Sequence, residues 1–300
     1  MTVLDVHFHY KVDMMINLLL LVALVPSAAL CQDLEARTLG FFTVEYPAFT
    51  SVIDLADTPG LYDLFVTTFE TQPNTTDEVY AVRDLAAKLD NVSAITTELV
   101  TDEILYPNEI NLVPEEVFGT PDVLWVASGF FVPTKNDGAV HLLSLQYGVP
   151  ATTVFVTDDP VPWYFHRADF LDMNGDGLID IVSARCNVTN HALMWYEHPS
   201  EGDPHKQIWK SHHIVDGPDI FFRIHELPVP GGSTRTAIIS TQYFTQLLTV
   251  TWTEDENGLW NDPSKIYHRV IDKDRGNYFD LEVVDLNADG NLDLLVSVNR

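Results

Sequence analysis

Short apolar segments separated by turn residues recur along the chain from about residue 40 onward. They are rich in Val, Ile, Leu, Phe, Tyr and Trp and are bounded by clusters of Gly, Pro, Asn and Asp, as in residues 191–217. β-Branched and aromatic residues favour strands, and these clusters favour turns. The pattern therefore predicts an all-β protein. One stretch, residues 76–89, has a helical pattern, and we predict a helix inserted there between strands.

The strand pattern repeats with a period of about 57 residues. Residues 168–184 and 281–298 each contain an apolar strand, an acidic loop and a second strand that opens at the last Asp of the loop. Weaker copies share the phase, so the series 63, 122, 180, 237 and 293 advances in steps of 59, 58, 57 and 56. A β-sandwich would not explain a loop that returns so evenly. The period predicts a β-propeller with four short antiparallel strands in each blade.

About five repeats are visible, and they define a predicted propeller domain over residues 40–300. Residue 300 falls after the strand that follows Asp293, so the fifth repeat is incomplete. A propeller closes its ring by pairing its first and last strands, and we therefore expect a chain that is a piece of a longer propeller of six or seven blades.

The two strong acidic loops have the residue types that Ca²⁺ prefers, because this ion takes about six to eight oxygen ligands. The predicted ligands alternate along each loop, with a glycine at the sharp turn. They are Asp172, Asn174, Asp176, the carbonyl of Leu178 and Asp180 in the first loop, and Asp285, Asn287, Asp289, the carbonyl of Asn291 and Asp293 in the second. An EF-hand is excluded, because position 12 is Ser183 or Val296 and the flanks are strands. The alternative is a metal-free turn rich in Asp, Asn and Gly.

With their flanking strands, these loops resemble the FG-GAP or VCBS repeats of the integrin-α propeller and of many secreted proteins. The resemblance covers residues 168–184 and 281–298, with degenerate support from the other copies. It implies a propeller scaffold with Ca²⁺ in the loops, and members of the family serve adhesion, matrix and ligand-binding roles, while some are enzymes. A fold hosts many functions, so the resemblance implies no particular substrate.

The chain is strongly acidic, with 44 Asp and Glu against 16 Lys and Arg and a formal net charge of −28. Such a surplus repels nucleic-acid phosphates and anionic membrane surfaces and concentrates cations. Nucleic acid is therefore excluded as a partner. A secreted acidic calcium binder would also suit a calcified matrix, so the expected partner is an extracellular protein or carbohydrate ligand, or mineral and matrix.

The first 31 residues have the layout of a secretory signal. An apolar run over residues 16–30 follows Lys11, and small residues at 27–29 offer a cleavage site. The run is interrupted by Pro26 and is shorter than the roughly 20 residues that a membrane helix needs, so we expect no stable membrane insertion. The predicted location is extracellular.

Three Asn-x-Ser/Thr sequons, at Asn74, Asn91 and Asn187, predict glycosylation on a secretory route. The chain has two cysteines, Cys31 and Cys186, which exclude a disulfide framework. Cleavage after Cys31 would leave Cys186 as a lone thiol, which we interpret as a small buried hydrophobe in a strand.

Candidate channel ligands are His166, Arg167, Arg223 and His225. Positions 166, 223 and 279 each lie fourteen residues before the repeat positions 180, 237 and 293, which predicts one level of a central channel. A second metal or an anionic sugar would suit such a ring, and residues 163–186 loosely resemble the propeller of fungal aldos-2-ulose dehydratases. The alternative is that these side chains cap strand ends or pair with acids.

No nucleophile elbow, His-Glu-x-x-His helix or phosphate loop is present in the sequence, so enzyme activity is allowed but not indicated. We predict a secreted calcium-binding β-propeller that acts as an extracellular binding or matrix protein. The alternatives are a secreted carbohydrate-active lyase with a metal in the channel, and part of the ectodomain of an adhesion receptor.

Overall fold

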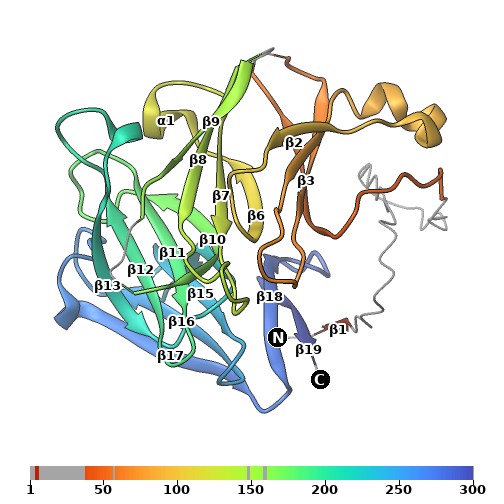
Figure 1. Cartoon of the computed structure of the whole chain (residues 1–300). Helices are drawn as coiled ribbons and strands as arrows, with labels where there is room; N and C mark the ends of the chain where they lie inside the picture. The colour runs from red at the N-terminus through yellow and green to blue at the C-terminus, as the bar shows by residue number, and fades with distance from the viewer. Residues whose placement is uncertain (1–3, 7–37, 57, 147–148, 158–160, 300) are drawn as a thin grey trace.

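The computed structural model describes residues 4–6, 38–56, 58–146, 149–157 and 161–299, and they form an all-β structure of several antiparallel sheets (Figure 1). Four sheets each contain four strands in chain order. Their bounds are β2 Pro47–Asp54, β3 Tyr62–Thr68, β4 Val79–Val82 and β5 Glu98–Thr101; β6 Pro107–Leu112, β7 Val123–Ser128, β8 Val140–Gln146 and β9 Val149–Phe155; β10 Tyr164–Leu171, β11 Asp180–Cys186, β12 His191–Glu197 and β13 Lys210–Asp216; and β14 Phe222–Pro228, β15 Thr234–Gln242, β16 Leu247–Thr253 and β17 Ile266–Lys273.

A fifth sheet consists of β18 (Asn277–Val284), β19 (Asp293–Asn299) and β1 (Leu4–Val6). Strand β18 pairs with β19 in antiparallel fashion, whereas β1 pairs with β19 in parallel. The predicted signal over residues 1–31 otherwise lies outside the described residues and stays a prediction. No helix among the described residues has the length and apolar character needed to cross a membrane.

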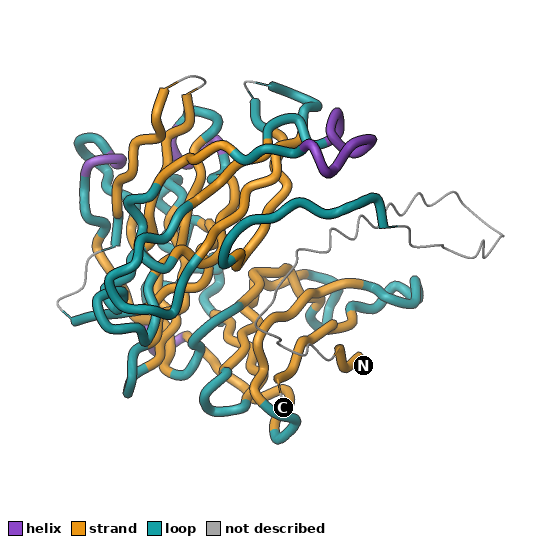
Figure 2. The backbone as a smooth tube through the Cα atoms, turned by 45° about the vertical axis from the view of Figure 1, so that its right-hand side comes forward, coloured by secondary structure: helices purple, strands orange, loops and turns teal. Residues whose placement is uncertain are grey.

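The first strands of the five sheets lie next to one another in chain order, from β2 through β6, β10 and β14 to β18. Figure 1 shows the sheets following one another around the molecule, and Figure 2 shows strands and loops making up most of the described backbone. The ring centroids of Phe49 on β2 and Phe221 just before β14 are 6.1 Å apart. Segments of the first and fourth sheets therefore approach each other near a common centre.

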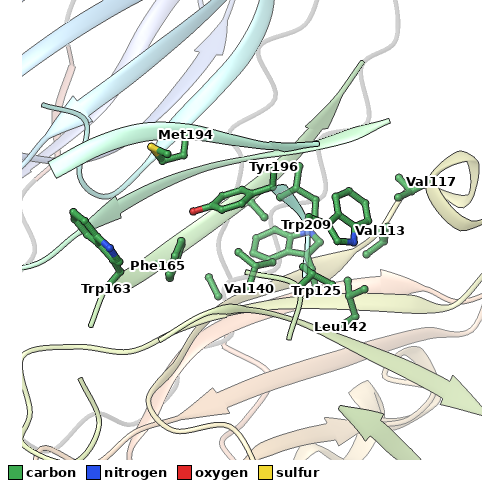
Figure 3. Close-up of a cluster of buried hydrophobic side chains, with 14 of the residues drawn as sticks. Val113, Val117, Trp125, Val140, Leu142, Trp163, Phe165, Met194, Tyr196 and Trp209 are labelled. Carbon is green, nitrogen blue, oxygen red and sulfur yellow. The ribbon is translucent and has the colours of Figure 1, made fainter. Parts of the chain in front are cut away.

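Apolar side chains fill the spaces between neighbouring sheets. The largest cluster joins the sheet of β6–β9 to the sheet of β10–β13 and includes Trp125, Phe165, Tyr196 and Trp209 (Figure 3). Further clusters lie between the other pairs of neighbouring sheets. Sheet faces are covered by the next sheet, which explains the runs of fully buried residues in central strands such as β7.

The repeat positions predicted from the sequence lie at comparable places in the fold. Residues 63, 180, 237 and 293 lie in the second strands of four sheets, and residue 122 directly precedes β7, the second strand of another. All five residues are buried, although four of them are aspartates. Each aspartate must therefore find hydrogen-bond donors inside the protein.

The predicted helix over residues 76–89 is wrong. Residues Val79–Val82 form strand β4, and a 3₁₀ segment, η1 (Ala86–Ala94), follows it. Val79, Ala81 and Val82 are fully buried and β4 pairs with β3, so packing between sheets overrides the local helical pattern. The other helical segments are α1 (Glu115–Phe118), η2 (Pro204–Lys206) and η3 (Pro263–Lys265).

A buried ion pair joins the loops of the first two four-stranded sheets. The Nζ atom of Lys135 lies 2.6 Å from Oδ1 of Asp77, and both side chains are almost fully buried. The ammonium also donates to the carbonyl of Glu70 at 2.9 Å and to Oγ1 of Thr75 at 2.8 Å. The Asp77 carboxylate in turn accepts from the backbone N–H groups of Glu70 and Tyr106, so both charges are satisfied.

Candidate functional site

The two acidic loops connect the first and second strands of their sheets, β10 to β11 and β18 to β19, and their hydrogen bonds correspond. In the first loop, Gly177 N donates to Oδ2 of Asp172 at 3.0 Å, and in the second Gly290 N donates to Oδ2 of Asp285 at 2.8 Å. Gly177 and Gly290 have φ values of +86° and +85°. A positive φ favours glycine, which explains this residue at the turn of both loops.

The middle of each loop is also organised alike. Asp176 N donates to Oδ1 of Asn174 at 2.9 Å, and Asp289 N donates to Oδ1 of Asn287 at 3.0 Å. Oδ1 of Asp176 and Oδ1 of Asp289 each accept from the backbone N–H two residues later, at 2.8 Å in both loops. These donors are Leu178 and Asn291, whose carbonyls are the predicted seventh-position ligands and remain predictions.

The last aspartate of each loop closes it from below. Oδ2 of Asp180 accepts from Met173 N at 2.8 Å, and Oδ2 of Asp293 accepts from Leu286 N at 3.2 Å. Asp180 also accepts from His198 N at 2.8 Å. Burial raises the pKa of Asp180 to about 6, and the charges of Asp176 and Asp172 add to this shift, so the three carboxylates lie within electrostatic reach of each other.

The donor chemistry of both loops fits a hard cation, since their side chains offer carboxylate and amide oxygens at alternating positions. In the structure these oxygens accept hydrogen bonds from the loop backbone, and the described residues contain no group of three or more His, Cys, Asp or Glu side chains gathered tightly enough for a metal ion. Ca²⁺ binding would therefore require the loop carboxylates to turn inward from their backbone donors. The loops keep the right ligands in the right order, and the ion remains a prediction.

The sequon asparagines lie outside the strands. Asn74 and Asn91 are exposed, and Asn187 is partly exposed at the turn between β11 and β12. The hydroxyls of Ser93 and Thr189 donate to the side-chain oxygens of Asn91 and Asn187, at 3.0 and 3.3 Å. The placement allows access to all three side chains, and glycosylation itself remains a prediction. Cys186, at the end of β11, is a buried free cysteine, as the sequence indicated.

Ion pairs connect the first strands of neighbouring sheets at their inner ends. Nη1 of Arg167 on β10 lies 2.7 Å from Oε1 of Glu109 on β6. Nη2 of Arg223 on β14 lies 2.6 Å from Oε1 of Glu282 and 3.3 Å from Oδ1 of Asp280, both on β18. Four consecutive sheets thus share one cluster of alternating charges.

The predicted channel level is correct for two of its three positions. His166 and Phe279 both lie where the register of the first strand shifts, in β10 and in β18. Arg223 does not share that level, because it pairs with Ile239, two residues after position 237. The corresponding residues are Asp169, opposite Val182, and Glu282, opposite Leu295.

The physical reason is the length of one hairpin. In the sheet of β14–β17, the first two strands pair as far as Pro228 and Thr234, so position 237 is opposite His225 and not opposite the strand end. The shift moves Arg223 to the level of Glu282 and explains their ion pair. His225 is partly buried on the same strand and is not among the residues that line the cavity described below.

Glu109 is the most perturbed member of the charged cluster. Burial raises its pKa to about 7, although the charges of Arg167 and Arg223 oppose the shift. The folded protein therefore holds a proton on Glu109 more tightly than the unfolded chain does. The stability that this proton affinity provides is fully present below the ordinary value of 4.5 and is lost as the pH rises through about 7.

Glu109→Gln is expected to remove this pH dependence. The difference in free energy of unfolding between the original protein and the variant should fall steadily as the pH rises from about 4.5 to about 7, and should be constant on either side. Urea unfolding at a series of pH values measures the difference. Glu256→Gln, at an exposed position, is the control and should show no such slope. A difference independent of pH would contradict a raised Glu109 pKa.

A cavity of about 710 Å³ opens beside the charged cluster. Its walls come from the ends of β10 and β18, from β19 and from loops after β7 and β15. Six aromatic or imidazole rings line it, namely Phe130, Phe131, His166, Tyr243, Phe244 and Phe279. Asp280 and Glu282 supply its acidic groups. Such a concave, mostly apolar space with a few polar groups is the usual form of a small-molecule site.

His166 lies at the wall of this cavity without a hydrogen-bond partner among the described residues. The residue is only 5% exposed, and its Nδ1 atom is buried and unsatisfied. Burial lowers the pKa of His166 to about 4, so the ring is neutral at neutral pH. A buried polar atom without a partner is costly, which makes this nitrogen a candidate contact for a bound molecule.

Sequence reasoning found the two arginines and His166 but missed Glu109, Asp280, Glu282 and the aromatic wall. A signal was available for the acids, because Glu109 lies 58 residues before Arg167 and Asp280 lies 57 residues after Arg223. Partners on neighbouring repeats are therefore separated by one period. The aromatic residues of the loops carry no such signal.

No family model matches the chain, and the comparisons with curated proteins and with solved structures found no match either.

Proposed function

We propose that this chain is part of a calcium-binding β-propeller of the FG-GAP or VCBS type, which acts outside the cell as a binding or matrix protein. In this proposal each four-stranded sheet is a blade, and the first strands surround a central channel. The order of neighbouring first strands and the approach of Phe49 to Phe221 support the arrangement.

The observation that carries the calcium proposal is the correspondence of the two loops. Asp172 and Asp285 accept from a glycine N–H, and Asp180 and Asp293 accept from the residue after the first loop aspartate, in loops of the same length between the same pair of strands. Such agreement over 113 positions of chain indicates one requirement acting on both loops. Three aspartates in one short loop repel each other, and a divalent cation between them would remove that repulsion.

A structural role for the ion follows from this geometry. Each loop joins the inner strand of a sheet to its buried second strand, so its shape determines how those two strands meet. Extracellular calcium modules bind with dissociation constants of about 10⁻⁴ to 10⁻³ M, which is close to saturation outside the cell. The acidic surface, with a net charge of −28, supports an extracellular role among cations or in a mineralised matrix.

Asp176→Ala and Asp289→Ala are each expected to remove one bound Ca²⁺ and to weaken the stabilisation that Ca²⁺ provides. At a few millimolar Ca²⁺, each occupied loop should contribute about 0.5–2 kcal/mol to the free energy of unfolding by mass action. Metal analysis of the purified protein, together with thermal melts in Ca²⁺ and in chelator, measures both effects. Both substituted residues are exposed, so neither change should disrupt the core.

The matched control is Asp137→Ala, which removes an exposed carboxylate from a loop outside the two sites. It should leave the calcium content and the chelator-dependent shift unchanged. Equal melts with Ca²⁺ and with chelator would reduce the loops to metal-free turns and would overturn the proposal.

A further inference from the structure

We propose that the aromatic cavity between β10 and β18 binds a small organic cation through its alkylammonium group. The proposal goes beyond calcium binding and does not depend on it, since none of the loop ligands lines the cavity.

The charge of the lining favours a cation. Asp280 and Glu282 both line the cavity, and none of its described lining residues is Lys or Arg. His166 adds no charge at neutral pH, because its pKa is about 4. The guanidinium of Arg223 faces both carboxylates from outside the lining, so one positive charge is shared between two negative ones. The net charge presented to a ligand is therefore negative.

The two carboxylates are not equally occupied. Arg223 binds Glu282 at two points, with Nη2 2.6 Å from Oε1 and Nε 3.2 Å from Oε2. Asp280 uses only Oδ1, which accepts from Leu281 N at 2.8 Å and from Arg223 at 3.3 Å. Oδ2 of Asp280 has no partner among the described residues, and the side chain is 41% exposed. Asp280 is thus the group that a cation would approach.

The aromatic wall provides the second attraction. Phe131 and Phe244 have ring centroids 5.6 Å apart, Phe244 and Tyr243 are 5.3 Å apart, and Tyr243 and Phe279 are 6.2 Å apart. These rings form a continuous wall in which each ring restricts the movement of the next. The negative face of an aromatic ring attracts ammonium groups, and methylated ammonium ions also bury apolar surface against it.

The remaining polar groups of the cavity argue against a sugar. A saccharide site needs several free donors and acceptors for hydroxyl groups, but Oγ of Ser297 accepts from Asp280 N at 2.9 Å and Nδ2 of Asn299 donates to Tyr243 at 3.3 Å. His166 is the buried polar side chain left without a partner among the lining residues described. A single free imidazole nitrogen suits the one hydroxyl of an amino alcohol.

Choline is therefore the probe, and 3,3-dimethyl-1-butanol is its neutral analogue of the same shape. Calorimetric titration of the Ca²⁺-loaded chain, at ionic strength matched with NaCl, should show choline binding about tenfold or more tightly than the analogue. Asp280→Asn and Phe244→Leu should each weaken choline binding by about 3- to 30-fold. Glu256→Gln, which removes an exposed carboxylate away from the cavity, should bind choline as the original chain does.

Several outcomes would overturn the proposal. Equal binding of choline and the neutral analogue would make the cavity merely apolar, and binding of a neutral monosaccharide in preference to choline would make it a sugar site. Absence of choline binding by a folded chain would remove the site altogether. If Asp280→Asn does not fold, Glu282→Gln replaces it, since that residue is exposed and its loss also lowers the negative charge. Calcium binding would be unaffected by any of these results.

Discussion

Lys135→Met is expected to lower the free energy of unfolding by about 3–5 kcal/mol, because it leaves a buried carboxylate without its cation. Lys135 is 1% exposed, and its ammonium is 2.6 Å from Asp77. A methionine fills similar volume but cannot donate to Asp77, to the carbonyl of Glu70 or to Thr75. The measurement is urea unfolding followed by tryptophan fluorescence.

The same substitution at Lys210 is the matched control. Lys210 pairs with Glu197 at 3.0 Å, but its side chain is 72% exposed, and exposed pairs contribute about 0–1 kcal/mol. Adding Asp77→Leu to Lys135→Met should not restore stability fully, because the N–H groups of Glu70 and Tyr106 would lose their acceptor. Equal losses for Lys135→Met and Lys210→Met would show that the buried pair does not connect the two sheets energetically.

Trp209→Ala should lower the free energy of unfolding by a similar amount, about 3–5 kcal/mol, through a cavity between two sheets. The indole is 2% exposed, lies 4.7 Å from the His198 ring and donates from Nε1 to the carbonyl of Pro204 at 3.1 Å. It belongs to the cluster that joins the sheet of β6–β9 to that of β10–β13 (Figure 3). Neighbouring strands are held by hydrogen bonds, so the space cannot collapse without breaking them.

Trp252→Ala tests whether burial between sheets is the cause. Trp252 lies on β16, is partly exposed and stacks on Tyr267 with ring centroids 5.8 Å apart. Its loss should lower the free energy of unfolding by less than about 2 kcal/mol, because water can fill the space. Thermal and urea unfolding of both variants give the comparison. A larger loss at Trp252 than at Trp209 would contradict the view that packing between sheets dominates stability.

Local residue preferences were enough to predict the class of fold. Alternating and continuous apolar runs with turn residues between them correctly indicated antiparallel strands, including the pair that flanks each acidic loop. They failed over residues 76–89, where a helical pattern forms β4 because its side chains are needed between two sheets. Propensity is a weak preference, and burial of four residues outweighs it.

The candidate sites divide in the same way. The loop residues Asp172–Asp180 and Asp285–Asp293 are near one another in the chain, so their spacing already fixed which oxygens share a loop. The cavity residues come from β10, β18, β19 and two distant loops, and no local pattern brings His166, Tyr243 and Asp280 together. The error over Arg223 has the same origin, because a change in hairpin register is invisible in residue spacing.

The sequence by itself determined the strands, the period of the repeat and the content of the acidic loops, since each depends on residues that are neighbours in the chain. The tertiary structure alone decided which charges meet across the sheets, such as Lys135 with Asp77 and Arg223 with Glu282, and where a cavity opens. These depend on register and on the packing of one sheet against the next. Both are set by the sum of many weak contacts between distant residues, and not by any single segment.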